Sequence, residues 1–254
     1  MNDIRITRDG HVGVAEIARP PNNFFNKPMI RELAEAFEAF DADPEIRCVL
    51  LVAEGKNFCA GADFSSPARD TVGDRDGGHL YQQAVRLFRT AKPIVAGVNG
   101  AAVGGGLGLS LVADFRVASP GTRFTANFNR LGFHPGFGIS ITLPRVVGAQ
   151  KAALLLYTGR RIGGEEAHAI GLADVLVPDE ELRSAALALA TEIAQSSPIA
   201  VASTRRTLRG DLADRITAMT DHELAEQTIH FDTADFKEGV KAMAERRAPV
   251  FQGA

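Results

Sequence analysis

The sequence N-G-A-A-V-G-G-G-L-G-L-S-L-V-A-D at residues 99–114 decides how the rest of the chain is arranged. A short run rich in β-branched residues, Ile94 to Val98, precedes it and predicts a buried strand. The apolar residues that begin at Leu107 predict a buried helix. The three glycines at 104–106 therefore lie where a strand turns into the N-terminus of a helix.

These glycines predict a site for an oxygen that carries or acquires negative charge. The first amides of a helix have no acceptor within the helix, and the helix dipole places partial positive charge there. Glycine also lets a ligand approach the backbone closely. The spacing does not fit a nucleotide motif, because Leu111 stands where the third glycine of G-x-G-x-x-G would fall, counting from Gly106. One alternative stays open, namely that the glycines only allow close packing of helix and strand.

Length and composition indicate an ordinary globular protein. The 254 residues can bury a sizeable core, in one large domain or a domain with an appendage, and 23% of them are charged. The net charge of −3, without a sustained basic block, argues against a nucleic-acid partner. We expect no membrane association and a cytoplasmic location, because neither a signal peptide nor a spanning apolar run is evident. Cys48 and Cys59 form no metal or redox motif, so we expect no metal and no separate cofactor.

Strand and helix signals alternate through the first part of the chain, which indicates an α/β architecture. The turn Asp9-Gly10 joins two alternating runs into an expected hairpin. Residues 65–78 form a polar segment without periodicity, for which a lid over a site and a plain surface loop both stay open. The remaining expected elements are strands at 48–53, 115–118, 123–125 and 175–177, and helices at 28–41, 80–88, 151–157, 165–170, 179–195, from 198, 212–229 and 233–246.

The C-terminal part of the chain shows only helix signals after Asp179. The apolar faces of these helices exceed what the core can cover, which predicts packing on another subunit. We therefore divide the chain into a core at residues 1–195 and a C-terminal helical oligomerisation region at 196–254.

Four motifs resemble those of the enoyl-CoA hydratase/isomerase (crotonase) superfamily, in the same order and at similar separations. They are R-P-P-N-N (19–23), K-N-F-C-A-G-A-D (56–63), K-P-I-V-A-G-V-N-G-A-A-V-G-G-G (92–106) and F-K-E-G-V-K-A-M-A-E-R-R-A-P-V-F (236–251). The resemblance covers nearly the whole chain. It implies a crotonase-like ββα spiral core, a C-terminal helical region that forms a homotrimer or a dimer of trimers, and an acyl-CoA thioester substrate, with coenzyme A entering as part of that substrate.

The resemblance also implies roles for particular residues. The backbone amides of Ala62 and Gly105 would hold the thioester oxygen, and a fixed donor of this kind contributes roughly 3–4 kcal/mol to transition-state stabilisation. Lys56 and Arg19 would approach the phosphates of coenzyme A. For each of them an ordinary solvated charge stays open as the alternative. Met243 would reach the coenzyme A of a neighbouring subunit. The expected substrate-binding residues are Asn23, Lys56, Ala60, Gly61, Asp63, Gly104, Gly108, Asn127, Phe128, Leu131 and Arg246.

The chain departs from the family at its catalytic carboxylates. Gly108 and Phe128 stand where hydratases of the family carry their two glutamates, and Gly136 stands where some isomerases carry an aspartate. Adding water to an enoyl thioester needs a base for the water and an acid for the α-carbon, which these residues cannot supply. Hydratase activity is therefore doubtful. The nearest titratable candidate is His134, for which a purely structural role stays open, and His79 either closes over the acyl group or lies on the surface.

Three hypotheses for the function follow. The chain is an acyl-CoA enzyme with atypical or weak hydration. Alternatively, it is a decarboxylase, C–C lyase or thioesterase on the same scaffold, whose chemistry needs mainly the oxyanion hole. The third hypothesis is a non-catalytic acyl-CoA-binding protein. Phe133 and Phe137, with Phe128, would make the acyl pocket apolar or serve ordinary core packing.

Overall fold

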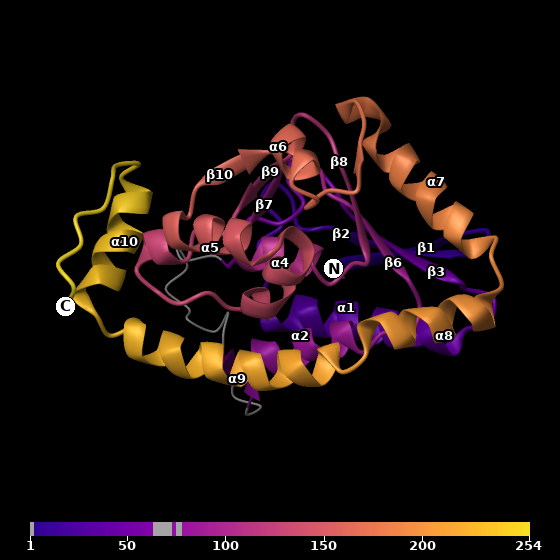
Figure 1. Ribbon diagram of the computed structural model, residues 1–254, viewed down its shortest axis with the longest axis horizontal. Coiled ribbons are helices and arrows are strands. Elements are labelled where there is room, and N and C mark those ends of the chain that lie inside the picture. Colours follow the sequence, from indigo (N-terminus) through magenta and orange to yellow (C-terminus); the bar gives the residue numbers. More distant parts are fainter. Residues whose placement is uncertain (1–2, 63–72, 75–77) are drawn as a thin grey trace.

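The computed structural model describes residues 3–62, 73–74 and 78–254 (Figure 1). It confirms the expected α/β class. The main sheet has six strands in the order β1-β2-β3-β6-β8-β11, and all neighbours are parallel except the hairpin β1–β2. A second sheet has the order β10-β9-β7. The strands are β1 (Ile4–Asp9), β2 (Val12–Ile17), β3 (Cys48–Ala53), β4 (Gly73–Asp74), β5 (Gly78–His79), β6 (Ile94–Gly97), β7 (Ala101–Val103), β8 (Phe115–Ala118), β9 (Arg123–Thr125), β10 (Arg161–Gly163) and β11 (Val175–Leu176).

Helices cover the sheets and extend beyond them. Figure 1 shows α7 lying over the main sheet, while α8 and α9 run one after the other along the length of the molecule, and α9 packs against α2. The helices are α1 (Lys27–Ala42), α2 (Leu80–Phe88), α3 (Gly105–Ser110), α4 (Ile139–Val147), α5 (Ala149–Thr158), α6 (Gly164–Ala169), α7 (Leu182–Ala194), α8 (Pro198–Arg209), α9 (Leu212–His230) and α10 (Ala234–Ala244). Short 3-10 turns lie at Asn129–Leu131 (η2) and Asp179–Glu181 (η3). The division at residue 195 stays a prediction.

Local chemistry explains where the helices begin. The side chain of Asn26 accepts a hydrogen bond from the amide of Met29, and Pro28 lies in the first turn, so α1 starts at Lys27. Helix α8 begins at Pro198, as the sequence predicts, but the side chain of Ser197 makes no capping hydrogen bond there.

The structure places an additional strand before the three glycines. The sequence predicts one strand, at residues 94–98, whereas the chain turns at Gly100 and forms β7 in the second sheet. Gly100 has a φ of 56°, which a residue with a side chain rarely adopts. A strand of three residues is too short to show a periodic pattern, and the same holds for β10.

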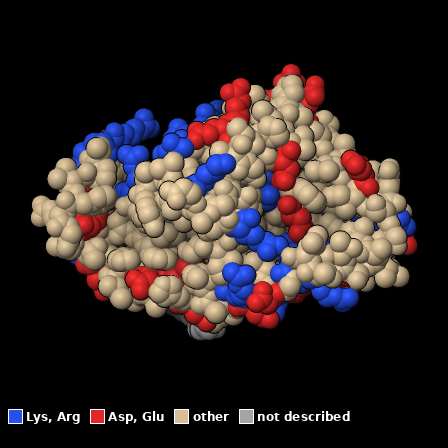
Figure 2. Space-filling view, viewed as in Figure 1, with Lys and Arg blue, Asp and Glu red and all other residues tan. Residues whose placement is uncertain are grey.

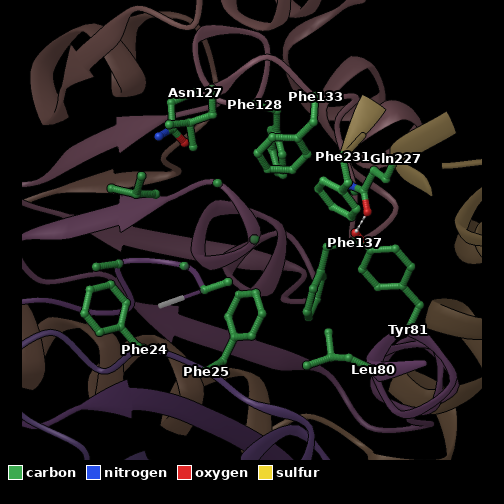
Figure 3. Close-up of a pocket in the computed structure, with 18 of the residues that line it drawn as sticks. Phe24, Phe25, Leu80, Tyr81, Asn127, Phe128, Phe133, Phe137, Gln227 and Phe231 are labelled. Atoms are coloured by element: carbon green, nitrogen blue, oxygen red, sulfur yellow. Dashed lines mark hydrogen bonds between the residues drawn. The ribbon is translucent and has the colours of Figure 1, made fainter. Parts of the chain in front are cut away.

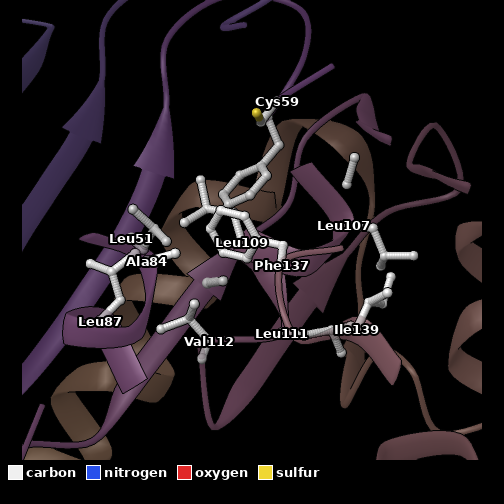
Figure 4. Packing of buried hydrophobic residues seen from close by; sticks show 14 of the residues in the cluster. Leu51, Cys59, Ala84, Leu87, Leu107, Leu109, Leu111, Val112, Phe137 and Ile139 are labelled. Atoms are coloured by element: carbon white, nitrogen blue, oxygen red, sulfur yellow. The ribbon is translucent and has the colours of Figure 1, made fainter. Parts of the chain in front are cut away.

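Helix α3 lies inside the largest hydrophobic core. All six of its residues are buried, and Leu107 and Leu109 are at most 1% exposed. Figure 4 shows these leucines among side chains from β3, α2 and α4. The core thus fixes the position of the glycines that open the helix.

An ion-pair network anchors α8 to the start of β6. The carboxylate of Asp114 accepts from Arg205 at 2.7 Å, from Arg209 at 2.8 Å and from the amide of Ile94 at 2.9 Å. Both guanidinium groups are largely buried. Because buried charges need partners, removal of this one carboxylate leaves two cations uncompensated.

We therefore expect Asp114→Asn to lower the free energy of unfolding by about 3 kcal/mol, as measured by urea denaturation. The matched control is Asp214→Asn, which breaks an exposed pair with Arg89 at 2.9 Å. That change should cost less than about 1 kcal/mol. Equal losses in the two variants would contradict the role of the Asp114 network.

The surface carries apolar side chains on several helices. Tyr157, Ile199 and Leu208 are more than 70% exposed. On the face in Figure 2, charges of both signs are scattered between wide uncharged areas. The expected packing on another subunit stays a prediction. In the described part of the chain no single helix is long and apolar enough to cross a bilayer. The segment of η3 and α7 together with α8 has the length and composition of a span, but the two parts are bent by 104° relative to each other.

Candidate active site

A cavity of about 250 Å³ lies between the glycine-rich run and the C-terminal helices (Figure 3). Its walls come from the loop after β3, the junction of β7 and α3, the loop around η2, and helices α2, α9 and α10. The lining residues are Phe24, Phe25, Ala60, Gly61, Ala62, His79, Leu80, Tyr81, Val103, Gly104, Gly105, Asn127, Phe128, Leu131, Phe133, Gly136, Phe137, Gln227, Phe231 and Met243. The described lining contains no carboxylate.

Two backbone segments at the cavity have fixed orientations. The carbonyl of Gly61 accepts from the amide of Phe25 at 3.0 Å, so the N–H of Ala62 points away from Phe25, because C=O and N–H oppose each other in a trans peptide. The carbonyl of Gly104 accepts from the amide of Gly108 at 3.1 Å, so the N–H of Gly105 points out of the start of α3.

The glycines are required here for steric reasons. A Cβ on Gly106 would lie 2.1 Å from the carbonyl oxygen of Cys59, and a Cβ on Gly105 would lie 2.4 Å from the ring of Phe25. Gly61 has a φ of 88°. The loop that carries Ala62 and the start of α3 therefore approach as closely as their backbones allow. The sequence alone left close packing and oxygen binding as alternatives for these glycines, and the geometry is compatible with both.

Aromatic side chains occupy the space where the resemblance places carboxylates. A Cβ on Gly108 would lie 2.8 Å from the Cβ of Phe137, and Phe128 itself lines the cavity. A Cβ on Gly136 would lie 1.8 Å from the hydroxyl oxygen of Tyr81. Figure 3 shows these rings around the cavity.

The Tyr81 hydroxyl belongs to a chain of hydrogen bonds. The amide nitrogen of Gln227 donates to the carbonyl of His134 at 2.9 Å, so its Oε1 faces Tyr81 and accepts the hydroxyl proton at 2.9 Å. Burial, and then the charge of Glu223, raises the pKa of Tyr81, so the hydroxyl stays protonated at neutral pH.

His79 lies in the cavity wall and is half-buried, which excludes the surface alternative. Its Nδ1 accepts from the amide of Tyr81 at 3.2 Å and caps α2. The two rings lie 4.3 Å apart, measured between centroids. Burial, with the charge of Lys27 as a second cause, lowers the pKa of His79 from 6.5 to about 4. The imidazole is therefore neutral at physiological pH and a weak base.

This lowered pKa predicts a pH-dependent contribution to stability. Because the unfolded chain binds the proton more tightly, the contribution is present above pH 6.5 and is lost as the pH falls toward 4. We expect the free energy of unfolding to fall in this window by about 2 kcal/mol more in the wild type than in His79→Asn, by urea denaturation. Parallel pH profiles would contradict the burial of a neutral His79.

The structure brings together most of the predicted site residues and separates others. The predicted residues that line the cavity are Ala60, Gly61, Ala62, Gly104, Gly105, Asn127, Phe128 and Leu131. The predicted residues that do not line it are Asn23, Lys56, Gly108, His134 and Arg246. Asp63 lies outside the described residues.

Some of the residues away from the cavity have structural contacts instead. Asn23 is fully buried and hydrogen-bonds Arg19, Glu54 and Asn57 through their backbones. Nδ1 of His134 lies 2.8 Å from the carbonyl oxygen of Pro135, and His134 is not among the residues that line the cavity.

The carboxylate of Glu223, on α9, also makes structural contacts outside the cavity. Glu223 is fully buried, and it accepts from the amides of Gly138 at 2.7 Å and Ser140 at 3.2 Å at the start of α4. Burial raises its pKa. It supports the loop behind the cavity rather than lining the cavity.

The C-terminal helices contribute residues that the sequence did not predict for this site. Gln227, Phe231 and Met243 line the cavity of their own chain, whereas the resemblance suggested that Met243 reaches a neighbouring subunit. Tyr81 was also missed. It is the second residue of α2, which follows the polar segment, and nothing in its local sequence indicates that the chain folds it against α9.

Neither cysteine offers redox or metal chemistry at this site. Cys48 and Cys59 are free and buried, and burial raises the pKa of each thiol to about 12. Within the described ranges, no group of three or more His, Cys, Asp or Glu side chains could hold a metal ion.

Two backbone amides of fixed orientation, those of Ala62 and Gly105, thus lie at an apolar cavity in an α/β fold. The match to known families identifies the class of protein. The chain belongs to the enoyl-CoA hydratase/isomerase family, whose sequence model matches residues 7–254.

Individual relatives support this assignment over the whole length. A probable enoyl-CoA hydratase of Bacillus subtilis (strain 168) is 33% identical over 258 residues, and 100% of each chain is covered. A 1,2-epoxyphenylacetyl-CoA isomerase of Escherichia coli (strain K12) is 33% identical, with 91% of this chain and 90% of that protein covered. The crystal structure of carnitinyl-CoA hydratase from Mycobacterium avium aligns with a TM-score of 0.89 and 29% identity, and covers 100% of both chains.

Proposed function

We propose that the protein is an acyl-CoA enzyme that stabilises a thioester enolate between the amides of Ala62 and Gly105, and that it forms this enolate without a carboxylate base. The observation that supports the proposal is the described cavity lining, which has Phe128, Phe137 and Tyr81 at or beside the positions where the resemblance expects the family's acids and contains no carboxylate. The thioester oxygen would carry the negative charge, where fixed donors are most effective.

Decarboxylation of a malonyl-type thioester fits this arrangement best. The bond between the α-carbon and the carboxylate breaks, its electron pair forms the enolate, carbon dioxide leaves, and water returns one proton to the α-carbon. The negative charge thereby moves from a carboxylate in the apolar cavity to the thioester oxygen, which lies between the two amide donors. Burial of an unpaired carboxylate is unfavourable, whereas the oxyanion is stabilised. No side chain has to remove a proton.

The test is carbon dioxide release and product mass with malonyl-CoA, methylmalonyl-CoA and phenylmalonyl-CoA. We expect turnover of at least one of these esters, with the decarboxylated acyl-CoA as product. The surface variant Tyr157→Phe serves as a control and should match the wild type, because Tyr157 is 77% exposed. Tight binding of all three esters without turnover would reject decarboxylation and favour a non-catalytic binding protein.

A further inference from the structure

Aromatic rings flank the point at which an acyl group would enter the cavity. The edge of the Phe128 ring lies 3.8 Å from the position that a Cβ on Gly104 would take. The rings of Phe25 and Phe137 lie 2.4 Å and 3.7 Å from the corresponding position on Gly105. Because the amide of Gly105 is one of the two proposed donors, an acyl group held there meets Phe128 and Phe137 first.

The rings form two groups that face each other, and each group is held by its own packing. Phe128 and Phe133 have centroids 5.5 Å apart at 80°, and Phe133 lies 5.4 Å from Phe231 of α9. In the second group, Phe137 and Tyr81 have centroids 6.4 Å apart at 84°. Figure 3 shows Phe128 and Phe133 on one side of the cavity and Phe137 on the other. Because each ring packs against another, the space between the two groups keeps its shape.

The cavity has room for one aromatic ring. A cavity of about 150 Å³ binds benzene, so about 250 Å³ holds one ring with the atoms that join it to a thioester, but not two rings. The hydrogen bond of 2.9 Å between Tyr81 and Gln227 joins α2 to α9 in the cavity wall. The described lining contains no Asp, Glu, Lys or Arg. This wall therefore favours an uncharged group of limited size.

We infer that the acyl group of the substrate ends in a single aromatic ring, which lies between Phe128 and Phe137. Aromatic rings gain energy from edge-to-face contacts beyond the burial of their area, and a saturated ring lacks this contribution. A flexible chain also loses rotational freedom when it is confined. The inference rests on the proposed function, because it takes the thioester to lie at Ala62 and Gly105. Phe128 and Phe137 thus determine specificity for the acyl group.

The test measures binding by isothermal titration calorimetry with three probes that each have eight acyl carbons: phenylacetyl-CoA, cyclohexylacetyl-CoA and octanoyl-CoA. None of them has a carboxylate to lose, so affinity is read without decarboxylation. We expect the wild type to bind phenylacetyl-CoA about fivefold more tightly than cyclohexylacetyl-CoA and about tenfold more tightly than octanoyl-CoA. Biphenylacetyl-CoA, which adds a second ring, should bind at least about tenfold more weakly than phenylacetyl-CoA, because the cavity lacks the volume.

The variants test whether the rings cause this preference. Phe128→Leu keeps the wall apolar but removes one ring, and it should lower the preference for phenylacetyl-CoA over cyclohexylacetyl-CoA to about twofold or less. Phe137→Leu changes the opposite side and should act in the same direction. The matched control is Phe115→Leu, because Phe115 lies on β8, is 39% exposed and does not line the cavity. It should leave the preference unchanged, and urea denaturation checks that each variant is folded.

Two results would overturn the inference. In the first, the wild type binds the three probes with equal affinity, a result that leaves the proposed function standing. In the second, the preference for the aromatic ring is the same in Phe128→Leu, Phe137→Leu and the wild type. If none of the esters binds at all, the proposed acyl-CoA function fails, and the inference fails with it.

Discussion

Crotonyl-CoA is expected to be hydrated at least 10²-fold, and up to about 10⁴-fold, more slowly by this protein than by a relative that carries both glutamates. The reason is the cavity wall, in which Phe137 packs over Gly108 and Phe128 lines the other side. Neither residue can activate water or protonate the α-carbon. His79 cannot replace them efficiently as a base at neutral pH, because its pKa is about 4. The measurement is the loss of the conjugated enoyl-thioester absorbance.

The control for this experiment is binding of crotonyl-CoA under the same conditions. It distinguishes a protein that binds the ester without hydrating it from one that does not bind the ester. Hydration at the rate of the glutamate-containing relative would show that a different acid and base act here. In that case Tyr81→Phe and His79→Asn become the next variants, because these are the titratable side chains in the described lining.

Gly106→Ala is expected to lower the turnover rate at least about 10²-fold and to lower the free energy of unfolding by about 1–3 kcal/mol. The added methyl group would lie 2.1 Å from the carbonyl oxygen of Cys59, so the loop carrying Ala62 and the start of α3 must move apart. Each amide would then leave its position around the thioester oxygen. Activity on the ester that the wild type turns over, together with urea denaturation, measures both effects.

Gly163→Ala is the matched control for this substitution. A Cβ on Gly163 meets no heavy atom within 4 Å, and its φ of −84° suits any residue. We expect wild-type activity and a stability change below about 1 kcal/mol. If Gly106→Ala behaved like Gly163→Ala, the close approach of the two loops would not matter for catalysis.

The positions of Ala62 and Gly105 show how far local sequence determines a site. Each residue lies in a motif whose glycines limit the backbone to a few conformations, and both residues line the cavity as expected. The positions of His134 and Asn23 show the limit. Both lie in loops of the expected kind, but their side chains bond to neighbouring backbone groups, and a motif does not indicate which way a side chain points.

The sequence by itself determined the α/β class and the family, because these depend on short motifs and on the alternation of strand and helix signals. The oxyanion donors at Ala62 and Gly105 and the loss of the carboxylates stay predictions. Only the tertiary structure decided what fills the vacated space. Tyr81 and Gln227 are 146 residues apart and meet because α2 packs against α9. His79, the residue that caps α2, also lines the cavity. Contacts of this kind depend on how distant helices pack, and no local pattern encodes them.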